Sequence, residues 1–394
     1  MKNRDNRVKI LYIITRLDAG GAQKSVLYSA ANLSKNKFKV FLAAGPGGVL
    51  DPFAKKLLKN KYFYINSLRQ RVCFYNLFYD LVSLFQTAWL IIKIRPHIIH
   101  TNCPKAGVVG RAAAFLTAPK TKVIHTYHGL GFSVYGGIKR YLFYSKIEKY
   151  FSFITDQLVF VSNSNMQEAL TLGIGNVKKN ILIYPGAEFE KLKPSFDYNA
   201  KLESLRIPKG AKVILSIGNF KPLKNARDFV LVAKHVLKKI PGAYFLYAGC
   251  GGMEERKVKT LAKKSGLKNH LFFLGMRHDT RELLAVSDLY VSTSLREGMP
   301  VALLEALGAG VPAVCYEADG TAEVLINGKN GFILGQRNKE GMSDKIIEIL
   351  KNDKIYFTIK QGVKSFDKNL FSAVSTVRKQ EELYNKILLK NPGS

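Results

Sequence analysis

Short apolar runs that alternate with helical stretches are the feature that most constrains the fold of this 394-residue chain. Residues 8–16 form such a run, and a glycine turn and a helical stretch follow it, which is typical of the opening of a βα unit. The pattern predicts further strands over residues 39–44, 97–102, 122–128, 157–162 and 181–185, and then over 213–218, 243–249, 271–275, 289–293, 312–316 and 331–334. This alternation predicts parallel sheets with helices on both faces, and ligand sites at the carboxyl ends of the strands.

The length of the chain predicts two domains, because 394 residues exceed what one hydrophobic core usually serves. Periodicity is lost after residue 185, so we place the linker near residues 186–200 and predict Rossmann-like domains over 1–186 and 187–371, followed by a helical tail. Hydrophobic residues make up 47% of the chain and charged residues 23%, which is typical of a folded globular protein. The four cysteines lie far apart without a CxxC pair, which indicates reduced thiols and argues against a zinc site.

The formal net charge of +32 is concentrated in the N-terminal half. The acidic residues of positions 1–150 are Asp5, Asp18, Asp51, Asp80 and Glu148. Such an imbalance predicts a positive field that attracts nucleic acid, an acidic bilayer or a phosphorylated substrate. A lysine-rich solvated surface without a special partner is the alternative.

Two stretches bear on localisation. The polar start Met-Lys-Asn-Arg-Asp-Asn-Arg-Val-Lys shows no signal-peptide pattern, so we expect a cytoplasmic protein. Residues 73–94 are long and apolar, but Asn76, Asp80, Ser83, Gln86 and Thr87 interrupt them. We favour a core helix here over a helix lying in the bilayer surface, and both over a helix that spans the membrane.

Two carboxylates stand eight positions apart in Arg-Glu-Gly-Met-Pro-Val-Ala-Leu-Leu-Glu-Ala-Leu-Gly-Ala-Gly-Val-Pro, at Glu297 and Glu305. Pro300 fits the first turn of a helix, which leaves Glu297 in the loop before it and Glu305 about one and a half turns inside it. The unpaired N–H groups of a helix start suit a diphosphate, and the carboxylates could accept hydrogen bonds from a ribose diol and from sugar hydroxyls. Two solvated glutamates beside an ordinary amphipathic helix would produce the same spacing.

This segment resembles the Glu-x7-Glu signature of glycosyltransferase family 4, whose members are retaining enzymes with the GT-B fold. Further matches to the family follow in the family's order, and the resemblance spans nearly the whole chain. They are Asp18-Ala-Gly-Gly-Ala-Gln23, Thr126-Tyr-His-Gly129, Ser216-Ile-Gly-Asn-Phe-Lys-Pro-Leu-Lys-Asn225, Phe273-Leu-Gly275 and Gly320-Thr-Ala-Glu-Val-Leu-Ile-Asn-Gly-Lys-Asn-Gly-Phe332. The resemblance implies two Rossmann-like parallel-sheet domains facing a central cleft, with the final helix (residues 372–390) returning to the N-terminal, acceptor-binding domain.

The same resemblance implies roles for individual residues. Glu305 would bind the ribose hydroxyls and Glu297 the donor sugar, while backbone amides around Gly298, Met299 and Val301 face the sugar hydroxyls and the diphosphate. The remaining donor contacts would come from Gly20 and Gly21, from the backbone of Met276 and Arg277 beside the base, and from His128, which reaches the transferred sugar. A lone histidine at the end of a strand can equally be structural.

Lys224 follows a strand and begins a helix in our prediction, where an ammonium and free N–H groups can neutralise a diphosphate leaving group. Relatives usually have Arg-x4-Lys here, but this chain has Asn219 in place of the arginine. That replacement loses a charge and keeps a hydrogen-bond donor. We hypothesise that Lys221, in the same loop, supplies part of the missing charge.

The sequence contains no Asp-x-Asp motif and no cluster with metal-ligand spacing, so we expect no metal and no cofactor beyond the nucleotide-sugar substrate. The family transfers with retention, which implies front-face displacement assisted by the donor phosphate. We therefore predict transfer of a hexose or N-acetylhexosamine, from UDP rather than GDP, to a lipid-linked or surface-glycan acceptor by a protein associated peripherally with the inner face of the cell membrane.

Two other classes remain as alternatives at this stage. The charge alone would suit a non-catalytic protein that binds nucleic acid or membranes on a degenerate scaffold, but no nucleic-acid motif is present. The fold alone would suit an oxidoreductase, but Gly249-Cys-Gly-Gly252 lacks the third spaced glycine of a dinucleotide fingerprint and is interpreted as a turn.

Overall fold

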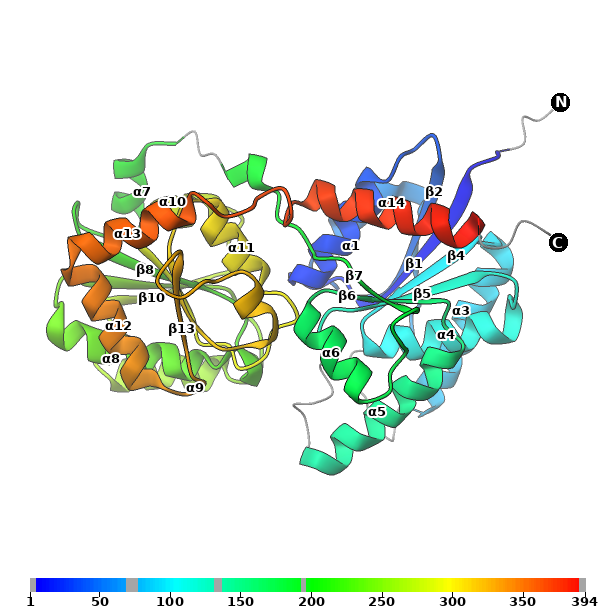
Figure 1. The fold of residues 1–394 in the computed structure, drawn as a ribbon, viewed down its shortest axis with the longest axis horizontal. Helices are drawn as coiled ribbons and strands as arrows, with labels where there is room; N and C mark the ends of the chain where they lie inside the picture. Colours follow the sequence, from blue (N-terminus) through cyan, green and yellow to red (C-terminus); the bar gives the residue numbers. More distant parts are fainter. Residues whose placement is uncertain (1–4, 69–76, 131–136, 193–195, 390–394) are drawn as a thin grey trace. The chain divides into compact units, whose positions relative to one another are not determined.

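The computed structural model describes residues 5–68, 77–130, 137–192 and 196–389 (Figure 1). The chain divides into two compact units. Unit 1 contains Met1–Gly186 and Ala373–Ser394, and unit 2 contains Ala187–Ser372. Unit 1 is therefore built from both ends of the chain, while unit 2 is continuous.

Unit 1 has a parallel sheet of seven described strands in the order β3-β2-β1-β4-β5-β6-β7. The strands are β1 (Val8–Arg16), β2 (Phe38–Gly45), β3 (Tyr62–Tyr64), β4 (Ile98–Asn102), β5 (Lys122–Tyr127), β6 (Gln157–Phe160) and β7 (Asn180–Leu182). Alternate residues of β1 face opposite sides, as the pleat of a strand requires. Tyr12 packs with Tyr384, and Leu11 with Leu90. Both faces are therefore buried, which explains the nearly continuous apolar run of β1.

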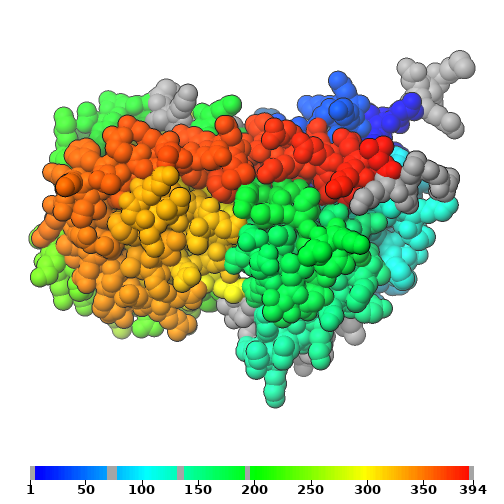
Figure 2. All heavy atoms as spheres, in the orientation of Figure 1, coloured from blue at the N-terminus to red at the C-terminus, as the bar shows by residue number. Residues whose placement is uncertain are grey.

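Helices cover both faces of this sheet (Figure 1). One face carries α1 (Gly21–Asn32), α2 (Asp51–Leu58) and α14 (Ala373–Leu389), and the other carries α3 (Leu77–Ile94), α4 (Pro104–Thr117), α5 (Gly137–Phe153) and α6 (Asn163–Thr171). The space-filling view shows the beginning of α5, in teal, standing out from the rest of unit 1 (Figure 2). This arrangement follows from right-handed crossovers in which the chain moves first towards β3 and then towards β7.

Unit 2 repeats the plan with a parallel sheet in the order β10-β9-β8-β11-β12-β13. Its strands are β8 (Lys212–Ile217), β9 (Ala243–Ala248), β10 (Leu271–Gly275), β11 (Leu289–Ser292), β12 (Ala313–Tyr316) and β13 (Gly331–Leu334). Its helices are α7 (Tyr198–Ser204), α8 (Ala226–Lys239), α9 (Glu255–Lys264), α10 (Thr280–Ala285), α11 (Val301–Gly308), α12 (Lys339–Lys351) and α13 (Asp353–Val363). The two α/β sheets confirm the predicted fold class.

Three local predictions need correction, and one strand was missed. The strand predicted over 181–185 is β7, Asn180–Leu182, and the short edge strand β3 was not predicted. Pro300 is the N-cap of α11 rather than part of its first turn, so that helix begins one residue later. Lys224 does not begin α8 but ends a 3₁₀ turn, Pro222–Lys224, because Asn225 adopts a left-handed conformation between the two.

Each sheet has one place where the strand order changes direction, and ligands of such folds bind outside the carboxyl ends of the strands there. In unit 1 this place lies between β1 and β4, and in unit 2 between β8 and β11. The loop after β8 carries Lys224 and the loop after β11 carries Glu297. The topology therefore brings two residues predicted separately to one edge of one sheet.

Among the described residues, no helix combines the length and the apolar character that crossing a membrane requires. The spanning alternative is therefore wrong for α3, the described part of residues 73–94. Leu90, Ile91 and Ile94 of α3 are buried against the sheet, which confirms that one side of this helix belongs to the core.

Candidate active site

Lys224 and Glu297 form an ion pair at the carboxyl edge of the unit 2 sheet. The side chains are 26% and 15% exposed, so much of the pair is withdrawn from water. Two contacts join their loops, from Leu295 N–H to the Leu223 carbonyl at 2.8 Å and from the Thr293 hydroxyl to the Asn225 carbonyl at 3.0 Å. These bonds fix a cation and a carboxylate side by side.

Asp319 holds the Glu297 loop from the 3₁₀ turn Asp319–Glu323, which follows the next strand, β12. Its carboxylate accepts a hydrogen bond from the Glu297 N–H at 2.9 Å and lies 3.2 Å from Nε of Arg296. The Asp319 side chain is only 8% exposed, and its backbone has a φ of 26°. Strained conformations of this kind cluster at functional sites. The sequence analysis did not single out Asp319, because its role depends on strand order rather than on a local motif.

Helix α11 begins directly after this loop, at Val301, without a side-chain cap. Its first N–H groups therefore have no intrahelical acceptor and can receive an anion. Met299 is buried, Gly298 and Val301 are half-buried, and Glu305 is half-buried in the second turn of the helix. The predicted donor residues of this segment thus lie along one short stretch of backbone beside the ion pair.

The loop after β8 places Asn219 and Lys221 at the same edge. Asn219 accepts a hydrogen bond from the Lys221 N–H through Oδ1 at 3.2 Å, while its carbonyl accepts one from the Tyr247 hydroxyl at 3.1 Å. The Lys221 side chain is exposed. The amide of Asn219 therefore shapes the loop, and the Lys221 side chain is left exposed to solvent at its edge.

The glycines of Gly249-Cys-Gly-Gly252 allow close packing against this loop. A Cβ on Gly249 would lie 1.9 Å from the Gly218 carbonyl oxygen, and Gly249 has a φ of 145°. Gly252 has a φ of 121°, and a Cβ there would lie 2.4 Å from the carbonyl carbon of Phe220. The segment is a turn that supports the loop of Asn219.

Met276 and Arg277 follow β10 and are half-buried. The guanidinium of Arg277 forms two hydrogen bonds to Asp279, at 2.8 and 2.5 Å. The Arg277 hydrogen bonds hold the pKa of the Asp279 carboxyl below its usual value. The side chain of Arg277 is thus engaged within its own loop, and its predicted contact with a base stays a prediction.

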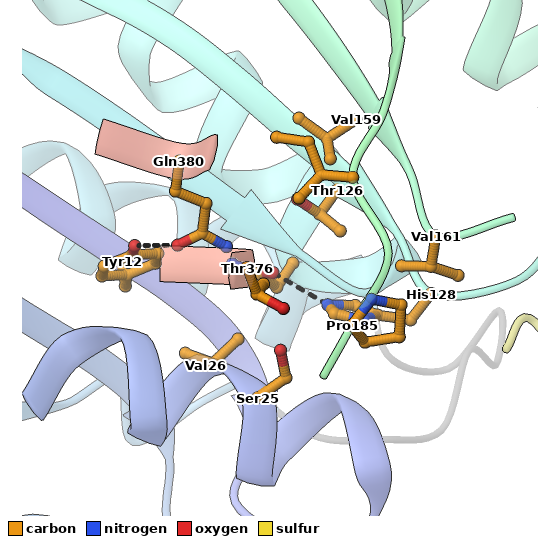
Figure 3. A pocket seen from close by; sticks show the side chains of 12 residues that line it. Tyr12, Ser25, Val26, Thr126, His128, Val159, Val161, Pro185, Thr376 and Gln380 are labelled. Atoms are coloured by element: carbon orange, nitrogen blue, oxygen red, sulfur yellow. Dashed lines mark hydrogen bonds between the residues drawn. The ribbon is translucent and has the colours of Figure 1, made fainter. Parts of the chain in front are cut away.

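His128 follows β5 in unit 1 and lines a small pocket at the carboxyl edge of that sheet (Figure 3). Its Nε2 lies 2.9 Å from Oδ1 of Asn102, so this ring nitrogen carries the proton. Burial lowers the pKa of His128 to about 4, so the ring is neutral at neutral pH. Asn102 is a partner that the sequence analysis missed.

A buried hydrogen-bonded chain lies beside this pocket and joins α14 to the sheet. The Tyr384 hydroxyl is 2.6 Å from both the Tyr12 hydroxyl and Nδ1 of His100, and Nε2 of His100 is 2.7 Å from the Thr126 hydroxyl. The Tyr12 hydroxyl also donates to Gln380 at 3.1 Å. These hydrogen bonds hold one wall of the pocket in place.

Gly20 and Gly21 form the start of α1, after β1. Gly20 is the N-cap of the helix and offers no side chain to its N–H groups, and no acidic residue lies in the first turn. The helix start can therefore accept an anion. Among the described residues, no group of three or more His, Cys, Asp or Glu side chains is arranged to hold a metal ion.

Comparison with known proteins matches both units to glycosyltransferase families. Residues 19–191 match the family model described as Glycosyltransferase Family 4, and residues 197–365 match the one described as Glycosyl transferases group 1. Among curated relatives, the Escherichia coli UDP-Gal:α-D-GlcNAc-diphosphoundecaprenol α-1,3-galactosyltransferase is 26% identical over 98% of each chain. The N,N′-diacetylbacillosaminyl-diphospho-undecaprenol α-1,3-N-acetylgalactosaminyltransferase of Campylobacter jejuni is 26% identical over 79% of this chain and 83% of its own.

Solved structures share the fold. The Anabaena protein HepE, in complex with UDP and glucose, superposes with a TM-score of 0.80 at 17% identity, covering 96% of this chain and all of its own. A glycosyltransferase from Rickettsia africae gives a TM-score of 0.75 at 23% identity, covering 97% of this chain and 99% of its own.

Proposed function

We propose a specific transfer reaction for this chain, which belongs to glycosyltransferase family 4 and has the GT-B fold. The reaction moves a hexose or N-acetylhexosamine from a UDP-sugar to a sugar linked through diphosphate to a polyprenyl lipid, at the cytosolic face of the membrane. The Escherichia coli and Campylobacter jejuni relatives, whose names specify diphosphoundecaprenol-linked acceptors, support this choice of acceptor.

The observation that carries the proposal is the Lys224–Glu297 pair beside the uncapped start of α11. A diphosphate placed there meets one ammonium, with the exposed Lys221 nearby, and a set of unpaired N–H groups. Preorganised positive charge of this kind stabilises a departing anion without reorganisation. No metal is needed in this scheme, since Lys224 and the helix start supply the charge.

The proposed step is a front-face displacement with retention. The bond from the sugar C1 to the β-phosphate oxygen breaks, and UDP leaves with the electron pair. The acceptor hydroxyl oxygen bonds to C1 from the same face, and its proton passes to the departing phosphate oxygen. Glu297 orients the sugar hydroxyls in this scheme, and recovery of a glycosyl adduct on Glu297 would overturn it.

Thermal unfolding with UDP, GDP and ADP tests the donor. A nucleotide at about 100 times its dissociation constant stabilises a protein by about 2.7 kcal/mol. We expect a shift with UDP alone, its loss in Glu305→Ala, and its retention in Glu340→Ala, which removes a carboxylate from the first turn of α12. A shift with GDP alone, or none with any nucleotide, would contradict the proposed donor.

A further inference from the structure

Helix α3 presents large apolar side chains to solvent. Five of them form a stripe, and their exposures are 71% for Phe78, 47% for Leu81, 71% for Phe85, 60% for Trp89 and 56% for Ile92. Their spacing of three and four residues places them on one narrow side of the helix. We call these five residues the α3 stripe.

The opposite side of α3 is partly polar. Ser83 and Thr87 are fully buried. The Ser83 hydroxyl lies 2.9 Å from the Ser67 hydroxyl, which lies 2.9 Å from Oε1 of Gln86. The buried side of α3 therefore carries hydroxyls as well as apolar side chains, while its large aromatic rings are exposed to solvent, which departs from the usual amphipathic arrangement. An exposed apolar patch of this kind marks an interaction surface.

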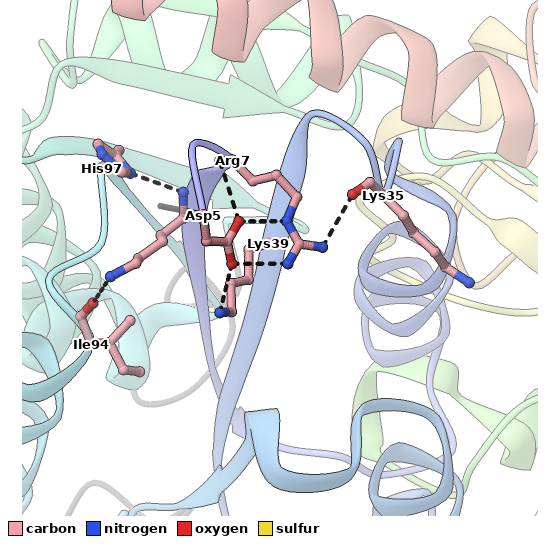
Figure 4. Close-up of polar contacts among 7 residues, drawn as sticks. Asp5, Arg7, Lys35, Lys39, Ile94 and His97 are labelled. Carbon is pink, nitrogen blue, oxygen red and sulfur yellow. Dashed lines mark hydrogen bonds and ion pairs between the residues drawn. The ribbon is translucent and has the colours of Figure 1, made fainter. Parts of the chain in front are cut away.

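Charge indicates what covers the stripe. The acidic side chains of residues 5–150 are engaged within unit 1, Asp5 by Arg7 and Lys39 (Figure 4), Asp18 by Arg16, Asp51 by Tyr62 and Tyr64, Asp80 by Lys105, and Glu148 by Arg111. At one end of the stripe, Lys93, Arg95 and Lys120 are exposed, and the Lys93 ammonium lies 4.6 Å from the centre of the Trp89 ring. The stripe is thus bordered by cations whose field the local carboxylates do not cancel.

An anionic bilayer matches both the exposed α3 stripe and the neighbouring cations. Its boundary region takes up apolar side chains, and its phosphates attract lysine and arginine. A second copy of this chain would bring two positive surfaces together and is disfavoured by repulsion. Phe115 and Leu116, 62% and 65% exposed at the end of α4, extend the apolar surface where α3 also ends.

We propose that α3 lies in the interface of an anionic bilayer with the α3 stripe inserted among the lipid chains. The inference rests on the proposed function, because a lipid-linked acceptor presupposes a membrane. Lys105, at the start of α4, pairs with Asp80 in the first turn of α3 at 2.7 Å. The beginning of the stripe therefore lies at the sheet edge where β4 ends and where Asn102 contacts His128. Docking through α3 would bring the lipid surface to that edge.

Trp89 provides a direct probe, because it is the only tryptophan in the chain. Its fluorescence would be recorded with phosphatidylcholine vesicles, with and without phosphatidylglycerol. We expect a blue shift, and quenching by lipids brominated in their acyl chains, only with the anionic vesicles. High salt should weaken binding, since it screens the attraction of the flanking cations to the headgroups.

Phe85→Gln should weaken vesicle binding about tenfold, which is the effect of withdrawing one aromatic side chain from an apolar environment. Phe357→Gln is the matched control, because Phe357 is 60% exposed on α13 in unit 2. Binding without a change in Trp89 emission, absence of binding, or burial of Trp89 by self-association without lipid would each overturn the inference. Thermal shifts with UDP, measured on the same variants, report separately on the proposed function, which can fail while docking of α3 persists.

Discussion

Replacing Lys224 with methionine is expected to weaken UDP binding by about one to two orders of magnitude. Methionine keeps the length of the side chain and removes its charge. A hydrogen bond to a charged group contributes about 1.5–3 kcal/mol, and each 1.4 kcal/mol is a factor of ten, so the expected increase in Kd is about 10- to 150-fold.

The neighbouring Glu297 affects the expected increase in Kd in two opposite ways. In the free protein the ammonium of Lys224 already pairs with Glu297, so exchanging that partner for a diphosphate lowers the gain. In Lys224→Met, however, a carboxylate that is 15% exposed stands unneutralised beside the diphosphate and repels it. The double variant Lys224→Met/Glu297→Gln removes this repulsion, and we expect it to bind UDP more tightly than Lys224→Met alone.

Isothermal titration with UDP would measure Kd for the wild type, for Lys224→Met, for the double variant and for Lys221→Met. Lys221 is an exposed lysine of the same loop, and an exposed charge is worth about 1 kcal/mol or less, so its loss should raise Kd about fivefold at most. An equal increase in Kd for UDP in Lys221→Met and Lys224→Met would refute the reasoning. So would a double variant that binds UDP no more tightly than Lys224→Met.

Two further predictions concern stability. Burial lowers the pKa of His100 to about 3 and of His128 to about 4, against about 6.5 in an unfolded chain, so the unfolded chain takes up protons first and unit 1 should lose stability as pH falls through this window. Calorimetry between about pH 6.5 and pH 3 would show that the free energy of unfolding depends less steeply on pH in His100→Gln. An unchanged slope would contradict this account. Gly249→Ala should destabilise unit 2 by more than about 2 kcal/mol, because its Cβ would meet the Gly218 carbonyl, whereas Gly251→Ala, with nothing within 4 Å of its Cβ, should cost about 1–2 kcal/mol. Urea unfolding would measure both, and equal losses would show that the close approach has no effect.

The strands could be predicted well from the sequence because each is a short apolar run bounded by glycine or polar residues. The strand predicted over 271–275, for example, is β10. The exceptions are two strands of three residues each, in which no periodicity can develop: β3 was missed, and β7 was predicted over 181–185 rather than Asn180–Leu182. Neighbouring strands in parallel sheets are connected through long crossovers, and the order of strands in each sheet was therefore not predictable from local pattern.

In the candidate site, too, local features could be predicted from the sequence, while contacts between distant residues could not. Glu297, Glu305 and Lys224 were each identified from their local surroundings, but the Lys224–Glu297 pair joins residues 73 positions apart and depends on β8 lying beside β11. The contact of His100 with Tyr384 spans 284 positions. For α3, hydropathy predicted a helix but not its rotation, because apolar side chains occur on both sides of it: Leu90, Ile91 and Ile94 face the core, while Phe85 and Trp89 face solvent.

Unit 1 is built from two separate segments of the chain, and this has a consequence for synthesis on the ribosome. Residues 187–372 form unit 2 without help from either end, so this unit can fold while the last residues are still being made. Unit 1 must wait, since Val377, Leu383, Tyr384 and Ile387 complete the apolar layer over Ile10, Tyr12 and Ile14. A chain cut after Ser372 would therefore release a folded unit 2 joined to a unit 1 whose sheet face lacks the cover of α14, a species that chaperones and proteases would recognise.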